Sequence, residues 1–396
     1  MSDWDSFETF LADVEQADDA KQRQDLVNAL LRQRSVWPWI DGNRATFVYS
    51  KMGTERAALN LDTIKADPPF APMKQIEGTS LWYVSREFAP DDLLDYMLAI
   101  DDPMTSLALE PNLVERVSNY WQPDPLNPLK LQTAQIDVSV LRMPQAPPFP
   151  DWASMEHVQH GTVNEHTLDS QRLGFTGRSL WVYTPPDYQP ENSYPLLILA
   201  DGNWCTGPLQ VPLIADALIK HGRIQPTVIA MMQSGSQEQR TAEFITNDRY
   251  VLFVLAELLP FIEQQYSIDS LNIGIGGVGI GALAAAHVTL NSYGAFNRLI
   301  MLSPPLQGQN RAEESLQHYR RRFETAPQLP ARIFQSVGRY EAFTRFLKPA
   351  RRLADVIRKH PETALQYVET GSGHGLVAFK AIFPEALVWA FPSEAL

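Results

Sequence analysis

A glycine-rich turn is the stretch of the sequence that most directly suggests chemistry. Gly277-Val278-Gly279-Ile280-Gly281 follows an apolar run at 272–275 and precedes a helix-type pattern. Its spacing is that of the Gly-x-Ser-x-Gly turn, whose outer glycines allow a strained strand-to-helix connection that lifts a serine hydroxyl above a sheet. The central residue here is Gly279, which has no nucleophilic atom. The pattern predicts a degenerate nucleophile turn, and a phosphate-binding glycine turn is the alternative.

Two later turns carry the other residue types of a catalytic triad. Gly338-Arg-Tyr-Glu341 follows the apolar run 333–337, and Thr370-Gly-Ser-Gly-His374-Gly375 follows the run 365–369. The order nucleophile position, acid, histidine is the chain order of one large class of acyl-transfer enzymes. Glu341 is therefore the candidate acid and His374 the candidate base.

A fourth turn could supply the oxyanion hole. Asp201, Gly202, Asn203 and Trp204 follow the apolar run 195–200. Their backbone N–H groups, together with that of Ile280, could stabilise a developing oxyanion whatever side chain occupies position 279. Trp204 belongs either to the core or to the wall of a pocket for an aromatic ligand.

A polar trio comes next along the chain. Arg240, Glu243 and Asn247 have i, i+3, i+7 spacing, which places them on one face if the segment is helical. We expect a structural network near the pocket, with a solvated helix face as the alternative.

Several other side chains have reactive or ligating atoms, but we expect no chemical role for them. Cys205 and Ser303 could be imagined as replacement nucleophiles, but a lone cysteine is more often a small buried apolar residue, and Ser303 lacks a glycine turn. His157, His160 and His166 lie close in sequence, but alternation along a strand would split their side chains, so we expect no metal site. No cofactor signature is present, because Gly-x-Gly-x-Gly is not the dinucleotide fingerprint.

The elements that must position these turns alternate between strand and helix. After about residue 150, strand-type runs occur at 180–184, 195–200, 227–232, 272–275, 298–302, 333–337 and 365–369. Helix-type runs occur at 211–220, 250–265, 281–290 and 346–359. Continuous apolar strands alternating with helices predict an α/β fold with a mostly parallel sheet covered on both faces. Together with the turns, this predicts an α/β-hydrolase three-layer sandwich.

The first part of the chain has a different pattern. Residues 6–34 predict two short helices, and short β-type runs follow at 46–49, 57–61, 80–84 and 96–100. Proline-rich segments at 123–128 and 144–150 predict linker or edge structure. We therefore expect a smaller immunoglobulin-like β-sandwich domain at 1–150, followed by the hydrolase domain at 151–396.

Composition excludes some partners. The net charge of −13 argues against binding to nucleic acid or to an anionic membrane. No run approaches the roughly 18 apolar residues of a membrane span, and the acidic N-terminus does not have the pattern of a secretory signal. A single cysteine fits a reducing compartment, so we expect the cytoplasm. An acidic chain can still carry a local pocket for a small-molecule ligand, which is the partner we expect.

Nearly the whole chain resembles the enterochelin esterase (ferric enterobactin esterase) family. The resemblance is carried by Gly161 to Ser170, Leu173-Gly174, Arg178, Val182 to Tyr188, Asp201-Gly202, Arg240 to Glu243, Asn247 and Glu257 to Pro260. It extends into the N-terminal part through Phe47-Val-Tyr, Gly78 to Trp82 and Asp124 to Pro128.

The resemblance implies an activity, and two departures put that activity in doubt. Members of the family hydrolyse the trilactone esters of ferric catechol siderophores in the cytoplasm, which releases iron. Glu341 and His374 match the family's acid and base, and residues 201–204 match its oxyanion loop. Gly279 stands where the family has serine, and Gly373-His374-Gly375 replaces the family's Gly-Gly-His-Asp.

Three hypotheses follow from these observations. The first is a catalytically impaired enterochelin-esterase-like protein, a pseudoenzyme that binds a siderophore or a related ester. The second is an active carboxylic ester hydrolase that uses a non-standard nucleophile or activated water. The third is a non-enzymatic scaffold or regulatory partner.

Overall fold

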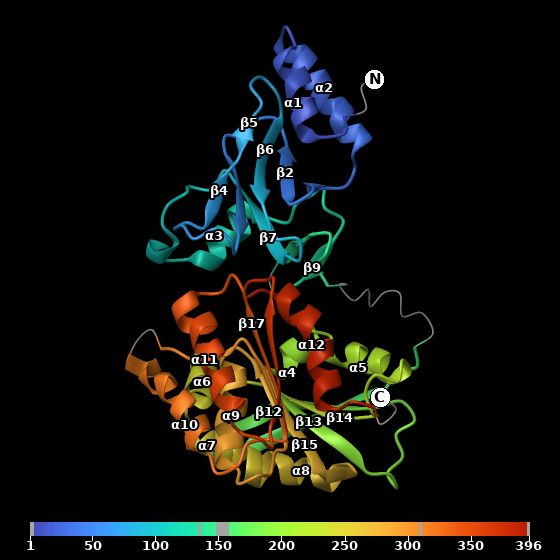
Figure 1. Ribbon diagram of the computed structural model, residues 1–396, viewed down its shortest axis with the longest axis vertical. Coiled ribbons are helices and arrows are strands. Elements are labelled where there is room, and N and C mark those ends of the chain that lie inside the picture. Colours follow the sequence, from blue (N-terminus) through green and yellow to red (C-terminus); the bar gives the residue numbers. More distant parts are fainter. Residues whose placement is uncertain (1–3, 134–135, 148–157, 309–310, 394–396) are drawn as a thin grey trace. The chain divides into compact units, whose positions relative to one another are not determined.

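The chain divides into two units by its internal contacts. The computed structural model describes residues 4–133, 136–147, 158–308 and 311–393 (Figure 1). The first unit comprises residues 1–148 together with 371–378, and the second comprises 149–370 together with 379–396. The boundary that the sequence predicts near residue 150 falls at 148–157, outside the described residues. Residues 371–378, which include His374, make most of their contacts within the first unit.

The first unit begins with two packed helices. They are α1 (Phe7–Glu15) and α2 (Ala20–Gln33), and the side chains of Ser6 and Asp19 cap their N-termini. These helices bury apolar residues at helical spacing against the strands that follow, as the sequence predicts.

Two antiparallel sheets form the rest of this unit. One has the order β1 (Trp39–Asp41), β2 (Arg44–Ser50), β6 (Leu81–Glu87), β5 (Lys74–Gln75). The other has the order β4 (Phe70–Pro72), β3 (Ala57–Leu61), β7 (Leu93–Ile100), β10 (Asp137–Arg142), β9 (Lys130–Gln132), and β8 (Trp121–Gln122) also pairs with β7. Phe47 of β2 meets Tyr96 of β7 edge to face with ring centroids 4.9 Å apart, so the two sheets share a core. The predicted N-terminal β-sandwich is confirmed. Two short elements, η1 (Leu107–Leu109) and α3 (Leu113–Tyr120), lie between β7 and β8.

One eight-stranded sheet organises the second unit. In spatial order its strands are β11 (Thr162–Ser170), β12 (Phe175–Thr184), β14 (Val228–Met232), β13 (Tyr194–Ala200), β15 (Ile268–Val278), β16 (Arg298–Leu302), β17 (Arg332–Gly338) and β18 (Ala364–Thr370). The pairs β11–β12 and β12–β14 are antiparallel, and all later pairs are parallel. The predicted mostly parallel sheet is confirmed.

Helices cover both faces of this sheet (Figure 1). One face is covered by α6 (Gln237–Phe244), α7 (Asp248–Phe253), α8 (Leu259–Gln265), α9 (Ile280–Asn291), α10 (Tyr319–Thr325) and α11 (Lys348–Ile357). The other face is covered by α4 (Gly202–Thr206), α5 (Val211–Lys220) and α12 (Leu376–Ala390). The helix predicted at 250–265 includes a π-helical turn, η3 (Val254–Leu258), and the one predicted at 346–359 begins from a second, η5 (Phe343–Leu347).

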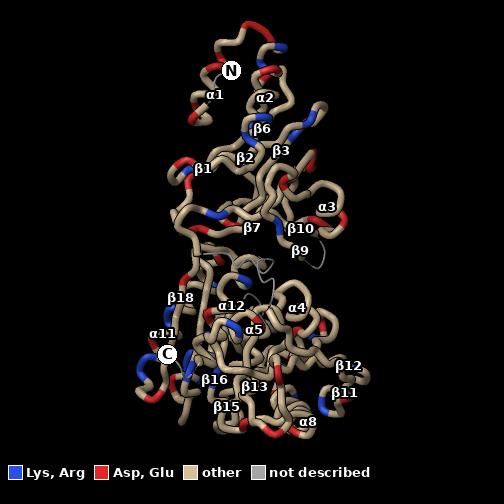
Figure 2. The backbone as a smooth tube through the Cα atoms, turned by 90° about the vertical axis from the view of Figure 1, so that its right-hand side faces the viewer, with Lys and Arg blue, Asp and Glu red and all other residues tan. Residues whose placement is uncertain are grey.

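Charged residues are distributed along the described chain. Figure 2 shows Lys and Arg scattered along the described chain among Asp and Glu. None of the described helices is long and apolar enough to cross a membrane.

Candidate active site

Gly279 lies at the apex of a sharp turn between β15 and α9. Its backbone has φ 58° and ψ −124°, and its N–H donates to the carbonyl of Leu302 at 2.9 Å. Glycine is nearly the only residue that adopts this region without strain. A Cβ on Gly277 would come within 2.5 Å of the Gly281 carbonyl carbon, so that glycine permits the close approach of strand and helix. The backbone therefore has the geometry of a nucleophile turn, with no side chain at its apex.

The candidate oxyanion loop begins at Asp201, which has the left-handed backbone conformation φ 60°, ψ 52°. The N–H of Asn203 donates to Gln233 Oε1 at 2.8 Å, and that of Trp204 donates to the Asp201 carbonyl. Within the described chain, the N–H of Gly202 has no hydrogen-bond partner. Of the predicted loop donors, the N–H groups of Asn203 and Trp204 are thus already paired, whereas that of Gly202 is available.

The second candidate donor is the N–H of Ile280, the first residue of α9. It also has no hydrogen-bond partner among the described residues. A cavity of about 10 Å³ lies between the loop and the end of β15, lined by Asp201, Trp204 and Gly277 among others. A water molecule needs at least about this volume, so these elements pack closely.

Two arginine–carboxylate pairs involve α6, and one of them holds the candidate oxyanion loop. Arg240 donates to both oxygens of Asp201, with Nε to Oδ1 at 2.7 Å and Nη2 to Oδ2 at 2.6 Å. Arg178 of β12 pairs with Glu243 in the same two-pronged way, at 2.7 and 2.9 Å. Bidentate pairs of this kind fix geometry as well as charge.

The third member of the predicted trio does not share their helix. Helix α6 ends at Phe244, and Asn247 instead caps α7 by accepting from the N–H of Arg249 at 2.9 Å. Arg240, Glu243 and Asn247 therefore do not share one helical face. A left-handed residue, Thr246, separates the two helices and redirects the chain.

Glu341 is buried in the turn after β17 and is held by two donors. The Ser303 hydroxyl donates to its Oε1 at 2.5 Å, and the N–H of Gly338 donates to the same oxygen at 2.6 Å. Ser303 follows β16 with a left-handed φ of 48°, and its side chain is also buried. The structure thus joins Ser303 to the candidate acid, a link that residue type alone did not suggest.

His374 belongs to the segment Gly371–Ala378, called here the histidine segment. Its side chain is exposed, and its backbone N–H donates to Asp62 Oδ2 at 2.9 Å. The Ser372 hydroxyl donates to the carbonyl of Leu93 at 2.7 Å. This segment is therefore fixed to β7 and to the turn after β3.

Two positions of the histidine segment have room only for glycine, because aspartate side chains lie close to the backbone there. A Cβ on Gly373 would lie 1.7 Å from Asp62 Oδ2, and a Cβ on Gly375 would lie 2.0 Å from Asp95 Oδ1. The Asp95 carboxylate accepts backbone N–H groups of Leu376 and Val377 at the start of α12. Burial, and then the charge of Asp62, raise the pKa of Asp95 to about 6. The sequence analysis did not identify Asp62 or Asp95 as neighbours of this segment. The repeated glycines were the available signal, because glycine allows another side chain to approach the backbone closely.

Cys205 lies in α4, just after the candidate oxyanion loop, and is buried. Its thiol donates to the carbonyl of Ala200 at 3.2 Å. Burial, and to a lesser extent the charge of Asp201, raise the pKa of this thiol well above its usual range. The thiolate form needed for nucleophilic attack is therefore disfavoured.

The histidines weighed as metal ligands have other partners. The Nδ1 of His160 lies 2.9 Å from Asp216 Oδ2, and the Nε2 of His166 lies 2.6 Å from the hydroxyl of Tyr266. His157 is outside the described residues. In the described ranges, no group of three or more His, Cys, Asp or Glu side chains could hold a metal ion.

The strand order and the turn at Gly279 define a hydrolase-type α/β domain, and family comparisons identify it further. Residues 171–390 match the Putative esterase family, and residues 42–152 match the N-terminal domain of enterochelin esterases. The chain therefore belongs to the enterochelin esterase family, with both of its domains represented.

Individual relatives agree with this assignment. The Iron(III) enterobactin esterase of Escherichia coli strain CFT073 is 28% identical over 171 residues, which cover 42% of each chain. The matched part thus spans less than half of that relative's length. Ferric enterobactin esterase from Salmonella typhimurium has a similar structure, with a TM-score of 0.78, 21% identity and coverage of 92% of this chain and 98% of that one. An enterobactin esterase from Shigella flexneri, crystallised in the presence of enterobactin, gives a TM-score of 0.73 at 20% identity, with coverage of 91% and 97%. At these identities the structural likeness establishes the fold.

Proposed function

We propose that this chain is a catalytically impaired member of the enterochelin esterase family that binds a ferric catechol siderophore, or a related ester, without efficient turnover. The observation that carries the proposal is Gly279, which has the backbone conformation of a nucleophile turn and no atom to attack with. The N–H groups of Gly202 and Ile280 support the retention of an oxyanion hole, because backbone donors do not depend on the residue at 279.

The size of the expected impairment can be bounded. Removal of the nucleophile from a serine triad costs on the order of 10⁶ in kcat, and the oxyanion hole and binding together retain about 10³ to 10⁴ over water. In this proposal Glu341 and His374 keep the roles that the family resemblance implies, and Gly202 is the donor that the 201–204 loop contributes. The ligand is a small molecule in the cytoplasm.

A comparison of Gly279→Ser with Gly279→Ala tests this proposal. Both substitutions place a side chain in the same strained backbone, but only serine adds a hydroxyl. We expect Gly279→Ser to hydrolyse ferric enterobactin at least about 10³ times faster than Gly279→Ala and the unaltered chain. His374→Ala in the serine background should abolish that gain. All variants should retain binding, measured by quenching of tryptophan fluorescence.

Two outcomes would contradict the proposal. Hydrolysis by the unaltered chain at ordinary enzyme rates, roughly 1 to 10³ per second, would favour an active hydrolase with a non-standard nucleophile or activated water. Failure of every variant to bind or hydrolyse ferric enterobactin would favour a scaffold or regulatory partner.

Ser303 is the specific alternative nucleophile, because its hydroxyl donates to Glu341 at 2.5 Å. Its burial, at 3% exposure, argues against direct attack on a substrate. Labelling of the unaltered chain by a fluorophosphonate probe, with loss of labelling in Ser303→Ala, would support this route to activity.

A further inference from the structure

A second cavity lies in the hydrolase-type unit. It is near the amino-terminal ends of the parallel strands, whereas the Gly279 turn follows a carboxyl-terminal end. It has a volume of about 590 Å³, and it is bordered by the amino-terminal halves of β17 and β18 and by the last turns of α12. Small-molecule pockets are typically about 300 to 1,000 Å³. Because β15 to β18 are parallel, this cavity and the Gly279 turn are at opposite ends of the strands.

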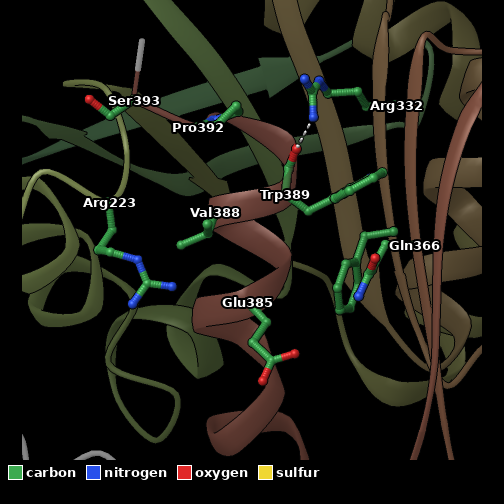
Figure 3. Close-up of a pocket in the computed structure, with 9 residues that line it drawn as sticks. Arg223, Arg332, Gln366, Glu385, Val388, Trp389, Pro392 and Ser393 are labelled. Atoms are coloured by element: carbon green, nitrogen blue, oxygen red, sulfur yellow. Dashed lines mark hydrogen bonds between the residues drawn. The ribbon is translucent and has the colours of Figure 1, made fainter. Parts of the chain in front are cut away.

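The apolar part of the lining comes from the sheet face under α12. Phe334 and Gln366 are register partners on β17 and β18, so their side chains share one face of the sheet. Trp389 of α12 points toward Gln366 and completes this wall, and Val388 lines the cavity on the side of Arg223 (Figure 3). The Trp389 indole N–H is buried and has no hydrogen-bond partner among the described residues. A buried donor of this kind is costly unless a ligand or water accepts from it.

Several charged and polar side chains at the cavity have unused hydrogen-bonding groups. In the part of the chain that the structure describes, the Arg223 guanidinium, the Glu385 carboxylate and the Gln366 amide have no side-chain partner. Arg332 donates one hydrogen bond, from Nη1 to the carbonyl of Trp389 at 3.2 Å, which leaves its other N–H groups for a ligand.

A neighbouring arginine adds to the positive charge. Arg298 is the register partner of Arg332, and its Nε donates to the carbonyl of Ala390 at 2.6 Å. Burial, with the charge of Arg332 as the second cause, lowers the pKa of Arg298. Two arginines and one glutamate line the cavity, so its net charge is positive on a chain whose total is −13. This arrangement favours an anion.

We propose that this cavity binds a small organic carboxylate with a planar apolar body. The carboxylate accepts from the free N–H groups of Arg332, with Arg223 adding positive charge, because a guanidinium matches a carboxylate in geometry. The planar body lies against Trp389 and Val388, and Gln366 and Glu385 accept from donors on the ligand. A phosphate ester fits less well, since Glu385 would repel its second negative charge.

The test uses hippurate, which combines a carboxylate, an amide and an aromatic ring. The full chain is labelled with 5-fluorotryptophan, and the ¹⁹F resonance of Trp389 is assigned from the spectrum of Trp389→Phe. This resonance reports on the cavity itself, so hippurate bound at the Gly279 turn does not count as support. Hippuramide, in which an uncharged amide replaces the carboxylate, is the control compound.

We expect hippurate to shift the Trp389 resonance in a saturable way and hippuramide to leave it unchanged. Arg223→Gln should weaken the hippurate response about tenfold, the size of one modest charge-assisted contact. Arg321→Gln, an exposed arginine on α10, should leave the response unchanged. The proposal is overturned if hippurate at about 10 mM leaves the resonance in place, if hippuramide binds equally well, or if both arginine variants behave alike. None of these outcomes depends on whether the chain hydrolyses esters.

Discussion

Two regions that carry the candidate catalytic residues are stabilised in different ways. Around the Gly279 turn, called here the elbow cluster, carboxylates meet arginines: Asp201 pairs with Arg240, and Glu243 pairs with Arg178. In the histidine segment, carboxylates instead accept hydrogen bonds from backbone N–H groups. Asp62 accepts one from His374, and Asp95 accepts from the first residues of α12. The elbow cluster has its charges compensated, whereas Asp62 and Asp95 repel each other.

This difference indicates that the two regions respond to different perturbations. Loss of one partner in the elbow cluster leaves an uncompensated charge, which is costly when partly buried. The histidine segment depends on close packing at its glycines, and the negative charge of Asp95 opposes its stability. The change in unfolding free energy on substituting a glycine, an arginine or an aspartate should therefore differ between the two regions.

The largest effect is expected for Gly375→Ala. Its Cβ would lie 2.0 Å from Asp95 Oδ1, so the carboxylate would have to move from the amides that it accepts. We expect a loss of about 4 kcal/mol in the free energy of unfolding, from overpacking together with lost hydrogen bonds. Urea denaturation measures it.

Gly281→Ala is the matched control in the elbow cluster. Its Cβ would have only ordinary contacts, the nearest at 3.4 Å, and alanine is favoured over glycine in α9. We expect stability to be unchanged or higher by up to about 1 kcal/mol. Equal losses in the two variants would mean that close packing does not distinguish the regions.

Arg240→Ala should have the next largest effect. The side chains of Arg240 and Asp201 are 21% and 15% exposed, so removal of the arginine leaves a largely buried carboxylate without its cation. We expect a loss of about 3 kcal/mol. Arg358→Ala, which breaks the exposed pair with Asp355, should cost less than about 1 kcal/mol. A similar small cost at Arg240 would show that the pair is not needed in the elbow cluster.

Asp95→Asn should have the smallest effect, and that effect should depend on pH. The folded-state pKa of Asp95 is about 6, above its usual 3.8, so the folded protein binds this proton more tightly than the unfolded chain. The resulting stability is present below about pH 4 and is lost as the pH rises through 6. Asparagine does not ionise, so the unfolding free energy of the variant should gain about 2 kcal/mol over that of the unaltered chain between about pH 4 and 7.

Denaturation of both proteins across this pH range measures the difference. A constant gap between them would mean that Asp95 does not titrate there.

Features encoded locally could be predicted from the sequence, whereas contacts between distant segments could not. The strand, glycine turn and helix around Gly279 are contiguous, so spacing and apolar pattern were sufficient to place them. Asp62 and His374 are 312 positions apart, and neither has a neighbour that marks the contact. The spacing of Arg240, Glu243 and Asn247 allowed one helical face, and it does not reveal the left-handed residue Thr246 that separates two helices.

The backbone at Gly279 also bears on how such a chain can change over evolution. A residue with a side chain at φ 58° and ψ −124° is strained by about 1 to 3 kcal/mol, and glycine avoids that strain. Marginal proteins have only about 5 to 15 kcal/mol of total stability. A mutation to serine would therefore reduce stability in the same step that supplied a nucleophile. Acquisition of a hydroxyl at this position would be best tolerated after stabilising substitutions elsewhere, so the glycine is more readily kept than replaced.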